Sequence, residues 1–212
     1  MSISLADRRT EPTAAIAAFL GRVTAWICTV GGLGGLLAAA VLTVEKLNLA
    51  ADPTYVPTCS INPILSCGSV MSSPQAQAFG VPNTLIGIAG FAVVSTIGVA
   101  LLARVQLPRW FWLGLQAGAT FGVLFVHWLI YQSLYVIGAL CPYCMLVWAV
   151  TIPIFLYVTM HNLYTNARAI PRVLRPSAAA AVRYHSLVLV SWYAAIVVAV
   201  LQRFWDYWTT LI

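Results

Sequence analysis

The chain has 212 residues, of which 61% are hydrophobic and only 8% are charged. Soluble domains carry roughly 25% charged residues, so this composition excludes an ordinary soluble domain and indicates an integral membrane protein. The formal net charge of +6 comes from arginines that flank apolar segments, which argues against a nucleic-acid partner.

Five apolar segments are long enough to cross a membrane, since a spanning helix needs about 20 mostly apolar residues. Their apolar runs are continuous and do not alternate as barrel strands do. We therefore predict an all-α integral membrane protein, with the first span retained as an anchor because it is longer than the core of a signal peptide. The predicted spans are Val23–Val44, Thr84–Leu102, Trp110–Tyr135, Cys141–Met160 and Ser186–Gln202.

The basic residues predict the orientation of these spans. With five crossings, nine of the eleven basic residues fall on the side of the N-terminus, and only Lys46 and Arg203 fall on the other. The positive-inside rule therefore places the N-terminus in the cytoplasm. The nine are Arg8, Arg9, Arg22, Arg104, Arg109, Arg168, Arg172, Arg175 and Arg183.

We expect one transmembrane domain over residues 1–212. Because the first two connections lie on opposite sides of the membrane, the long first loop is expected outside the cytoplasm. The parts are a cytoplasmic tail (1–22), an extracytoplasmic cysteine loop (45–82), spans two to four (83–160), a basic cytoplasmic loop (161–185) and the fifth span (186–212).

Four of the five cysteines fall on the outer side by this count. Cys59 and Cys67 lie in the first loop, and Cys141 and Cys144 form a Cys-Pro-Tyr-Cys motif at the start of the fourth span. Disulfides form and persist in that compartment. Cys28, inside the first span, is expected to be a small buried apolar residue.

The Cys-Pro-Tyr-Cys motif is typical of a reactive dithiol. If a helix begins near Cys141, the two cysteines share one face, and Pro142 suits the first helical turn. The unpaired N–H groups and the dipole at a helix start favour the thiolate, which is the form that attacks disulfides. Two other interpretations remain open: a structural disulfide, and a zinc site completed by the loop cysteines.

The loop around Cys67 predicts a short helix. Asn62 and Pro63 are typical of a helix N-cap and first turn, and the Ser72-Ser73-Pro74 sequence should end the helix. We expect this helix to lie over the mouth of the bundle and to carry Cys67 towards Cys141. Cys59 is expected on a more flexible stretch that an outside partner can reach.

Taken together, these motifs resemble the vitamin K epoxide reductase family in its bacterial form, without a fused thioredoxin domain. The resemblance covers about Ala25–Met160. It rests on Cys59, on Ser66-Cys67 followed by Val70 and Ser72-Ser73, on Gly80-Val81-Pro82-Asn83 with Gly87, and on Cys141-Pro142-Tyr143-Cys144.

The resemblance implies a four-helix bundle of spans one to four around a quinone pocket, a peripheral fifth helix, and an outer loop that carries a short helix. It implies that Cys59 and Cys67 take electrons from a separate DsbA-like thioredoxin-fold protein. Cys67 would pass them to Cys141 through a mixed disulfide, and Cys144 would face a membrane quinone, menaquinone or ubiquinone. The protein would lie in the bacterial inner membrane and support disulfide formation in exported proteins.

The family pattern also implies three pocket residues. Asn83 would donate a hydrogen bond to a quinone carbonyl, with helix capping as its alternative role. Trp148 would pack on the quinone ring, or simply belong to the core or face lipid. Met71 occupies a position near the pocket where vertebrate members carry an aromatic residue.

Two more pocket candidates come from the third span. His127 is a polar residue inside a membrane span, where such residues usually face the bundle, and Tyr131 follows at helical spacing. They could contact a quinone or move a proton, or His127 could instead satisfy a neighbouring helix.

Two alternative functions were weighed. A DsbB-like oxidase would share the chemistry on another fold, but its CxxC motif would come in the first outer loop, whereas here it comes second. A small transporter or assembly factor with purely structural disulfides is the other alternative. Transporters tend to show internal repeats or charges within spans, and this sequence shows neither.

Overall fold

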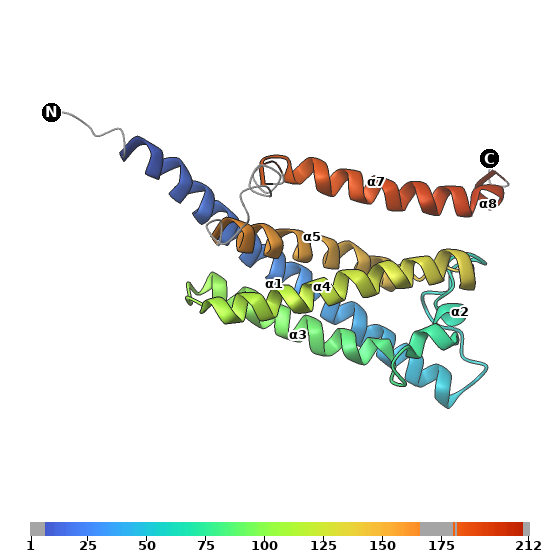
Figure 1. Ribbon diagram of the computed structural model, residues 1–212. Coiled ribbons are helices and arrows are strands. Elements are labelled where there is room, and N and C mark those ends of the chain that lie inside the picture. The colour runs from blue at the N-terminus through green and yellow to red at the C-terminus, as the bar shows by residue number, and fades with distance from the viewer. Residues whose placement is uncertain (1–6, 166–179, 181, 210–212) are drawn as a thin grey trace.

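The structure is a computed structural model that describes residues 7–165, 180 and 182–209, with side chains from residue 18 onward. Five helices in it are long and apolar enough to cross a membrane. Figure 1 shows them running side by side along one common direction. They are α1 (Asp7–Ala51), α3 (Asn83–Leu102), α4 (Arg109–Tyr131), α5 (Pro142–Thr165) and α7 (His185–Arg203).

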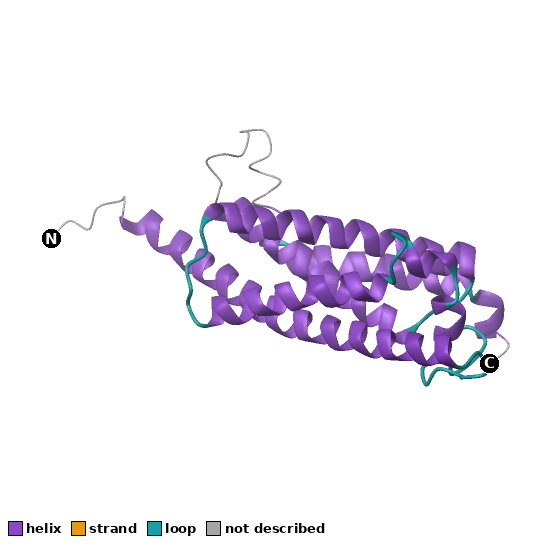
Figure 2. Cartoon of the chain, turned by 90° about the horizontal axis from the view of Figure 1, so that it is seen from below, coloured by secondary structure: helices purple, strands orange, loops and turns teal. Residues whose placement is uncertain are grey.

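Each of the five helices covers all or most of one predicted span, and the described residues form no strand beyond one isolated bridge. The third predicted span continues from α4 into the next helical segment, and the fourth begins one residue before α5. Figure 2 shows helix throughout, joined by loops at the two ends. The all-α membrane prediction is thus confirmed. The shorter helical segments are α2 (Cys67–Met71), η1 (Pro74–Gln77), η2 (Gln132–Ile137) and α8 (Trp205–Thr209).

Helix α1 is the centre of the bundle and packs mainly against α3 and α5, while α4 packs against α5. Glycines allow the close approach of α1 and α3. A Cβ at Gly32 would lie 2.7 Å from the backbone nitrogen of Ser95, and one at Gly98 would lie 2.4 Å from the backbone nitrogen of Thr29. Because backbone cannot move aside as a side-chain tip can, only glycine permits this spacing.

Helix α7 lies at the periphery, as predicted, and none of its residues is buried. In Figure 1 it runs along one side of the other four long helices. Two hydrogen bonds hold its middle: Trp192 Nε1 donates to His127 Nε2 at 2.8 Å, and the Tyr193 hydroxyl donates to the carbonyl of Ala149. At its far end Arg203 Nε donates to the carbonyl of Leu134 at 2.7 Å.

One end of the bundle carries both cysteine pairs. The loop after α1, the short helix α2 and the start of α5 meet there (Figure 1). The opposite end carries Arg104 and Arg109, where α3 ends and α4 begins. The predicted flanking residues Arg168, Arg172 and Arg175 lie outside the described residues.

The short loop helix exists, but the prediction of where it starts was wrong. The Asn62 side chain accepts hydrogen bonds from the backbone N–H groups of Ile64 and Leu65, which closes a turn. The chain then extends, and α2 begins only at Cys67. The extension occurs because Leu65 pairs with Leu140 of another segment, a tertiary contact that helix capping signals do not report.

Candidate active site

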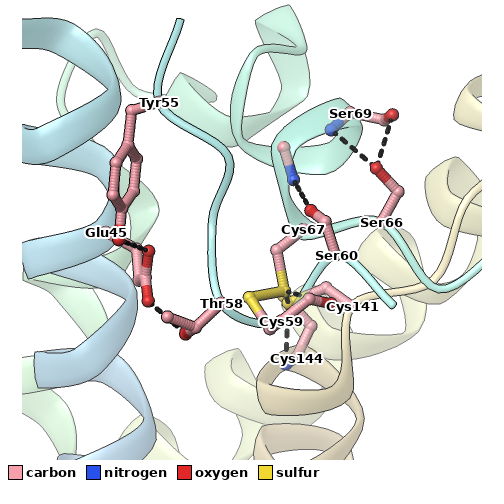
Figure 3. Close-up of a disulfide and its surroundings, with 11 residues drawn as sticks. Glu45, Tyr55, Thr58, Cys59, Ser60, Ser66, Cys67, Ser69, Cys141 and Cys144 are labelled. Carbon is pink, nitrogen blue, oxygen red and sulfur yellow. Dashed lines mark hydrogen bonds between the residues drawn. A yellow bond between two sulfur atoms is a disulfide. The ribbon is translucent and has the colours of Figure 1, made fainter. Parts of the chain in front are cut away.

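Three of the four cysteines of the loop and the CPYC motif meet at one point. Cys59 and Cys67 form a disulfide, and the Cys141 Sγ atom lies 3.1 Å from the Cys67 Sγ atom (Figure 3). Cys67 and Cys141 are 0% exposed, and Cys59 is 6% exposed. The loop disulfide is thus in direct contact with the first cysteine of the CPYC motif, as disulfide exchange requires.

A parallel β-bridge between Leu65 and Leu140 brings the two cysteine segments together. The backbone N–H of Leu140 donates to the Ile64 carbonyl at 2.7 Å, and the backbone N–H of Ser66 donates to the Leu140 carbonyl at 2.9 Å. The two segments run in the same direction, so Cys67 and Cys141 come shortly after the bridge on both of them. Two backbone hydrogen bonds therefore fix the relative position of the reacting sulfurs.

Two serine hydroxyls hold the backbone on either side of the loop disulfide in place. Ser66 is the N-cap of α2, and its hydroxyl accepts a hydrogen bond from the backbone N–H of Ser69 at 3.3 Å. The Ser60 hydroxyl accepts from the backbone N–H of Gly68 at 3.2 Å (Figure 3). The segment next to Cys59 is thereby tied to the helix that carries Cys67.

A buried carboxylate, which the sequence analysis did not single out, holds the chain before Cys59. Glu45, near the end of α1, accepts hydrogen bonds from the hydroxyls of Tyr55 and Thr58 (Figure 3). The prediction that Cys59 is flexible and accessible is therefore wrong for this state, since the segment before Cys59 is held to α1 by these hydrogen bonds. In the sequence, Glu45 stands out only as an acidic residue directly after an uncharged apolar span.

The start of α5 gives its two cysteines different surroundings. Cys141 precedes the first helical residue, Pro142. The pKa of the Cys141 thiol is held below its ordinary value, although burial acts to raise it. The largest cause is hydrogen bonding from the Cys144 thiol, and the backbone N–H groups of Cys144 and Tyr143 add to it. Cys141 is therefore the better nucleophile towards the loop disulfide beside it.

Cys144 lies on the wall of a cavity of about 620 Å³ inside the bundle. The wall is formed by α1, α3, α4 and α5, and it is almost entirely apolar. Asn83 and Trp148, two of the predicted pocket residues, also line it. The structure thus brings Cys144, Asn83 and Trp148 together around one space large enough for a small aromatic ligand.

The other three pocket candidates do not line this cavity. His127 uses both ring nitrogens elsewhere, with Nδ1 bonded to the Val123 carbonyl at 2.7 Å and Nε2 accepting from Trp192. Tyr131 is 57% exposed and lies against Tyr135. Met71 is buried among the cysteines, where it packs against the disulfide region.

The reasons for these placements are local. In a membrane span a polar ring must find a partner, and His127 finds it on α7, which was the alternative role considered for it. Tyr131 lies four residues after His127 on α4, so it shares the face of that helix that is directed away from the cavity. Met71 ends α2, whose position follows from the bridge at Leu65.

The Asn83 side chain is already engaged with the loop. Its Nδ2 donates to the Gln75 carbonyl at 2.7 Å, and its Oδ1 accepts from the backbone N–H of Ala78 at 3.1 Å. Asn83 does not cap its own helix, which begins after Pro82. It instead fastens η1 to the start of α3, and one N–H of its amide is left for a ligand.

The sulfur atoms of Cys59, Cys67 and Cys141 lie within 4.8 Å of one another, which is a spacing that a metal site could use. Two of these sulfurs are bonded to each other, and a zinc ligand must be a free thiolate. The cluster in this state therefore has the chemistry of a disulfide relay.

The sequence profile of the vitamin K epoxide reductase family matches residues 26–159. The match includes both cysteine pairs, the short helix α2 and the cavity wall, and it stops before α7.

Proposed function

On the premise that this chain belongs to the vitamin K epoxide reductase family, and so is a membrane thiol oxidoreductase, we propose that it reoxidises a thioredoxin-fold partner at the expense of a membrane quinone. The partner has a DsbA-like thioredoxin fold and lies outside the cytoplasm, and the quinone is menaquinone or ubiquinone. The observation that carries this proposal is the 3.1 Å separation of the Cys67 and Cys141 sulfurs.

The outer couple exchanges with the partner in two balanced steps. A partner thiolate attacks the sulfur of Cys59, which forms a mixed disulfide and releases the Cys67 thiolate. The second partner thiol then attacks the partner's own sulfur in that bond, which leaves the partner oxidised and both Cys59 and Cys67 reduced. Each step is a thiolate displacement at a disulfide. Cys59 is nearly buried here, so the partner must displace the segment pinned by Glu45.

The inner couple then receives the two electrons. The Cys67 thiolate attacks Cys141 of a Cys141–Cys144 disulfide and releases the Cys144 thiolate. Cys59 next attacks Cys67, so the loop disulfide forms again and Cys141 is released. The result is an oxidised outer pair beside a reduced inner pair, which is the state of the structure.

The cavity residues fit a quinone. Its wall is apolar, Cys144 stands on it, and Trp148 offers an aromatic face. When bound, a quinone supplies an acceptor for two electrons and two protons. Cys144 presents its thiol to that space, and Cys141 remains behind it to close the inner disulfide.

The membrane location follows from the five apolar helices. We place the N-terminus in the cytoplasm and the cysteine end of the bundle outside, in the inner membrane of a bacterium. Support comes from Arg104 and Arg109 at the end opposite the cysteines, where the positive-inside rule expects them.

The relay can be tested by trapping its central intermediate. In Cys144→Ala, the Cys141 thiolate can attack Cys67, and no Cys144 thiol is left to resolve the bond. We expect a Cys67–Cys141 disulfide to accumulate, with Cys59 free. Mass mapping of unreduced peptides would detect it. Cys28→Ala, which changes a buried cysteine remote from the relay, is the control.

Absence of that linked peptide in Cys144→Ala, under conditions where the wild type cycles, would contradict the relay. It would favour the alternative of purely structural disulfides. In that case Cys144→Ala and Cys141→Ala would behave alike and leave the Cys59–Cys67 bond intact.

A further inference from the structure

Within the described part of the chain, every hydrogen bond to the Glu45 carboxylate comes from one short segment of the outer loop. The Tyr55 hydroxyl donates to it at 2.8 Å, and Thr58 donates through both its hydroxyl and its backbone N–H. Glu45 is only 5% exposed. Cys59 comes directly after Thr58, so a buried carboxylate on α1 holds the segment that ends at the cysteine a partner would attack (Figure 3).

The charge of this acceptor makes the closed position of the segment the favoured one. Hydrogen bonds to an ionised acceptor are roughly twice as strong as those between neutral groups. If the segment moved away, Glu45 would lose all of these donors at once, and a buried charge without donors is costly until water replaces them. The segment therefore opens against a free-energy cost that is set largely by one carboxylate.

The closed segment shields the disulfide that the relay uses. Cys59 is nearly buried and Cys67 fully so, and Leu42 and Met71 belong to the same buried cluster. A thiolate must reach one of the two sulfurs to exchange, so reduction from outside requires the segment to open first. A small thiol has no further contacts with which to offset the cost of opening. A protein has them, because the surface that it buries on docking supplies binding free energy.

We propose that Glu45 is a specificity-determining residue: through Tyr55 and Thr58 it keeps the Cys59–Cys67 disulfide closed to small thiols, whereas a protein that docks on the loop can open it. The inference rests on the proposed function for the nature of that protein. The electron balance gives the reason for such a device. A small thiol that reduced the outer pair would pass two electrons on towards the quinone without oxidising a partner.

The test measures how fast a small, hydrophilic thiol, mercaptoethanesulfonate, reduces the loop disulfide of the purified protein. One thiolate forms a mixed disulfide with Cys59 and releases the Cys67 thiolate. A second thiolate then displaces the first, which leaves the small disulfide and both cysteines reduced. Tyr55→Phe, which removes one donor, should raise the rate about 10-fold. Glu45→Gln, which removes the charge, should raise it at least as much. Alkylation followed by mass analysis of the peptides gives the rate at each cysteine.

The matched control is Thr54→Val. The Thr54 hydroxyl also donates to a carboxylate, that of Asp52, but this bond lies within the loop and does not join the loop to α1. Thr54→Val should therefore react like the wild type. A second arm replaces the small thiol by a reduced DsbA protein, whose docking opens the segment in the wild type as well. In that arm Tyr55→Phe should gain much less than with the small thiol, so the ratio of the two rates should fall.

A Tyr55→Phe protein that reacts with the small thiol no faster than Thr54→Val would overturn the inference, and so would an equal gain in both arms. Either result leaves the relay intact, because the Cys67–Cys141 linkage in Cys144→Ala is measured separately. If Glu45→Gln does not fold, Tyr55→Phe decides alone, since it keeps the carboxylate. A wild-type loop disulfide that the DsbA protein cannot reduce would instead refute the partner part of the proposed function.

Discussion

Cys141 and Cys144 are only three residues apart, but they face different parts of the molecule. Cys141 lies just before α5, against the loop disulfide, and Cys144 lies one turn into the helix, on the cavity wall. A helix start supplies free N–H groups to the first of the two and not to the second. In the proposed relay, the spacing of the motif thus separates two roles: Cys141 exchanges with Cys67, and Cys144 faces the cavity.

This difference predicts the titration of Cys141. Its pKa is lowered, first by the hydrogen bond from the Cys144 thiol, so its thiolate should persist to lower pH than that of an ordinary thiol, whose pKa is about 8.5. We expect the thiolate absorbance that is lost in Cys141→Ala to have a midpoint below that value. Thiolate absorbance followed against pH, in a Cys28→Ala background, measures it.

Removing the donor should reverse the shift. In Cys144→Ala the Cys141 midpoint should move to higher pH, because the thiolate loses its largest source of stabilisation. A midpoint that is already at or above the ordinary value with Cys144 present would contradict the assignment of Cys141 as the nucleophile. Because Cys144→Ala is expected to lose its free Cys141 thiol to Cys67, which lies 3.1 Å away, the titrations should be compared in a background in which Cys59 and Cys67 are replaced by alanine.

Among the helices, α1 and α3 depend on glycine for their contact, and the cavity depends on that contact. Gly32 and Gly98 bring the backbones of α1 and α3 close together. Helices α3 and α4 face each other across the cavity. On α4, a Cβ at Gly114 or Gly118 would meet no neighbouring atom within 4 Å. Glycine thus serves close packing on one side of α3 and open space on the other.

We expect Gly32→Ala to destabilise the bundle. The added Cβ would lie under 3 Å from the backbone of Ser95, so the two helices would have to separate, at a cost of about 1–3 kcal/mol. Thermal unfolding in detergent would show a lower midpoint. Gly21→Ala, also on α1 but with nothing within 4 Å of the new Cβ, is the matched control and should unfold like the wild type.

A Gly32→Ala protein as stable as Gly21→Ala would mean that α1 and α3 do not pack as closely in the membrane as they do here. The cavity wall would then need revision as well, because α3 provides much of it.

In the molecule as a whole, function is concentrated at one end and along one interior space. Four cysteines, the loop and the start of α5 share an end, and the cavity runs inward from Cys144 between the helices. Helix α7 stands outside this arrangement, yet Arg203 donates to the Leu134 carbonyl in η2, the segment that leads into the CPYC motif. The peripheral helix therefore supports the approach to the inner couple.

The orientation of the whole molecule can be tested by labelling. In a protein that lacks the native cysteines, Gln77→Cys marks the cysteine end and Val105→Cys marks the opposite end, and both positions are exposed. A membrane-impermeant maleimide added to intact cells from which the outer membrane has been removed should label Gln77→Cys and spare Val105→Cys. The reverse pattern would place the relay in the cytoplasm and refute the proposed location.

Much of the fold could be predicted because a helix that crosses a membrane must be long and almost free of charge. The five spans follow from apolar length alone, and the predicted boundaries lie close to those of α3, α4, α5 and α7. The site was predictable where it depends on motifs, as for Cys141, Cys144 and the loop cysteines. It was not predictable where side chains choose partners, as for His127 and Glu45, because the sequence does not say which helices are neighbours.

The sequence by itself determined how many helices are long and apolar enough to cross a membrane and that the two cysteine pairs share one end of the bundle, because hydrocarbon excludes charge and unpaired backbone from long apolar helices. The tertiary structure alone decided which sulfurs touch. That contact depends on two backbone hydrogen bonds between Leu140 and the segment 64–66, and backbone groups are the same in every residue, so no side-chain pattern records their pairing.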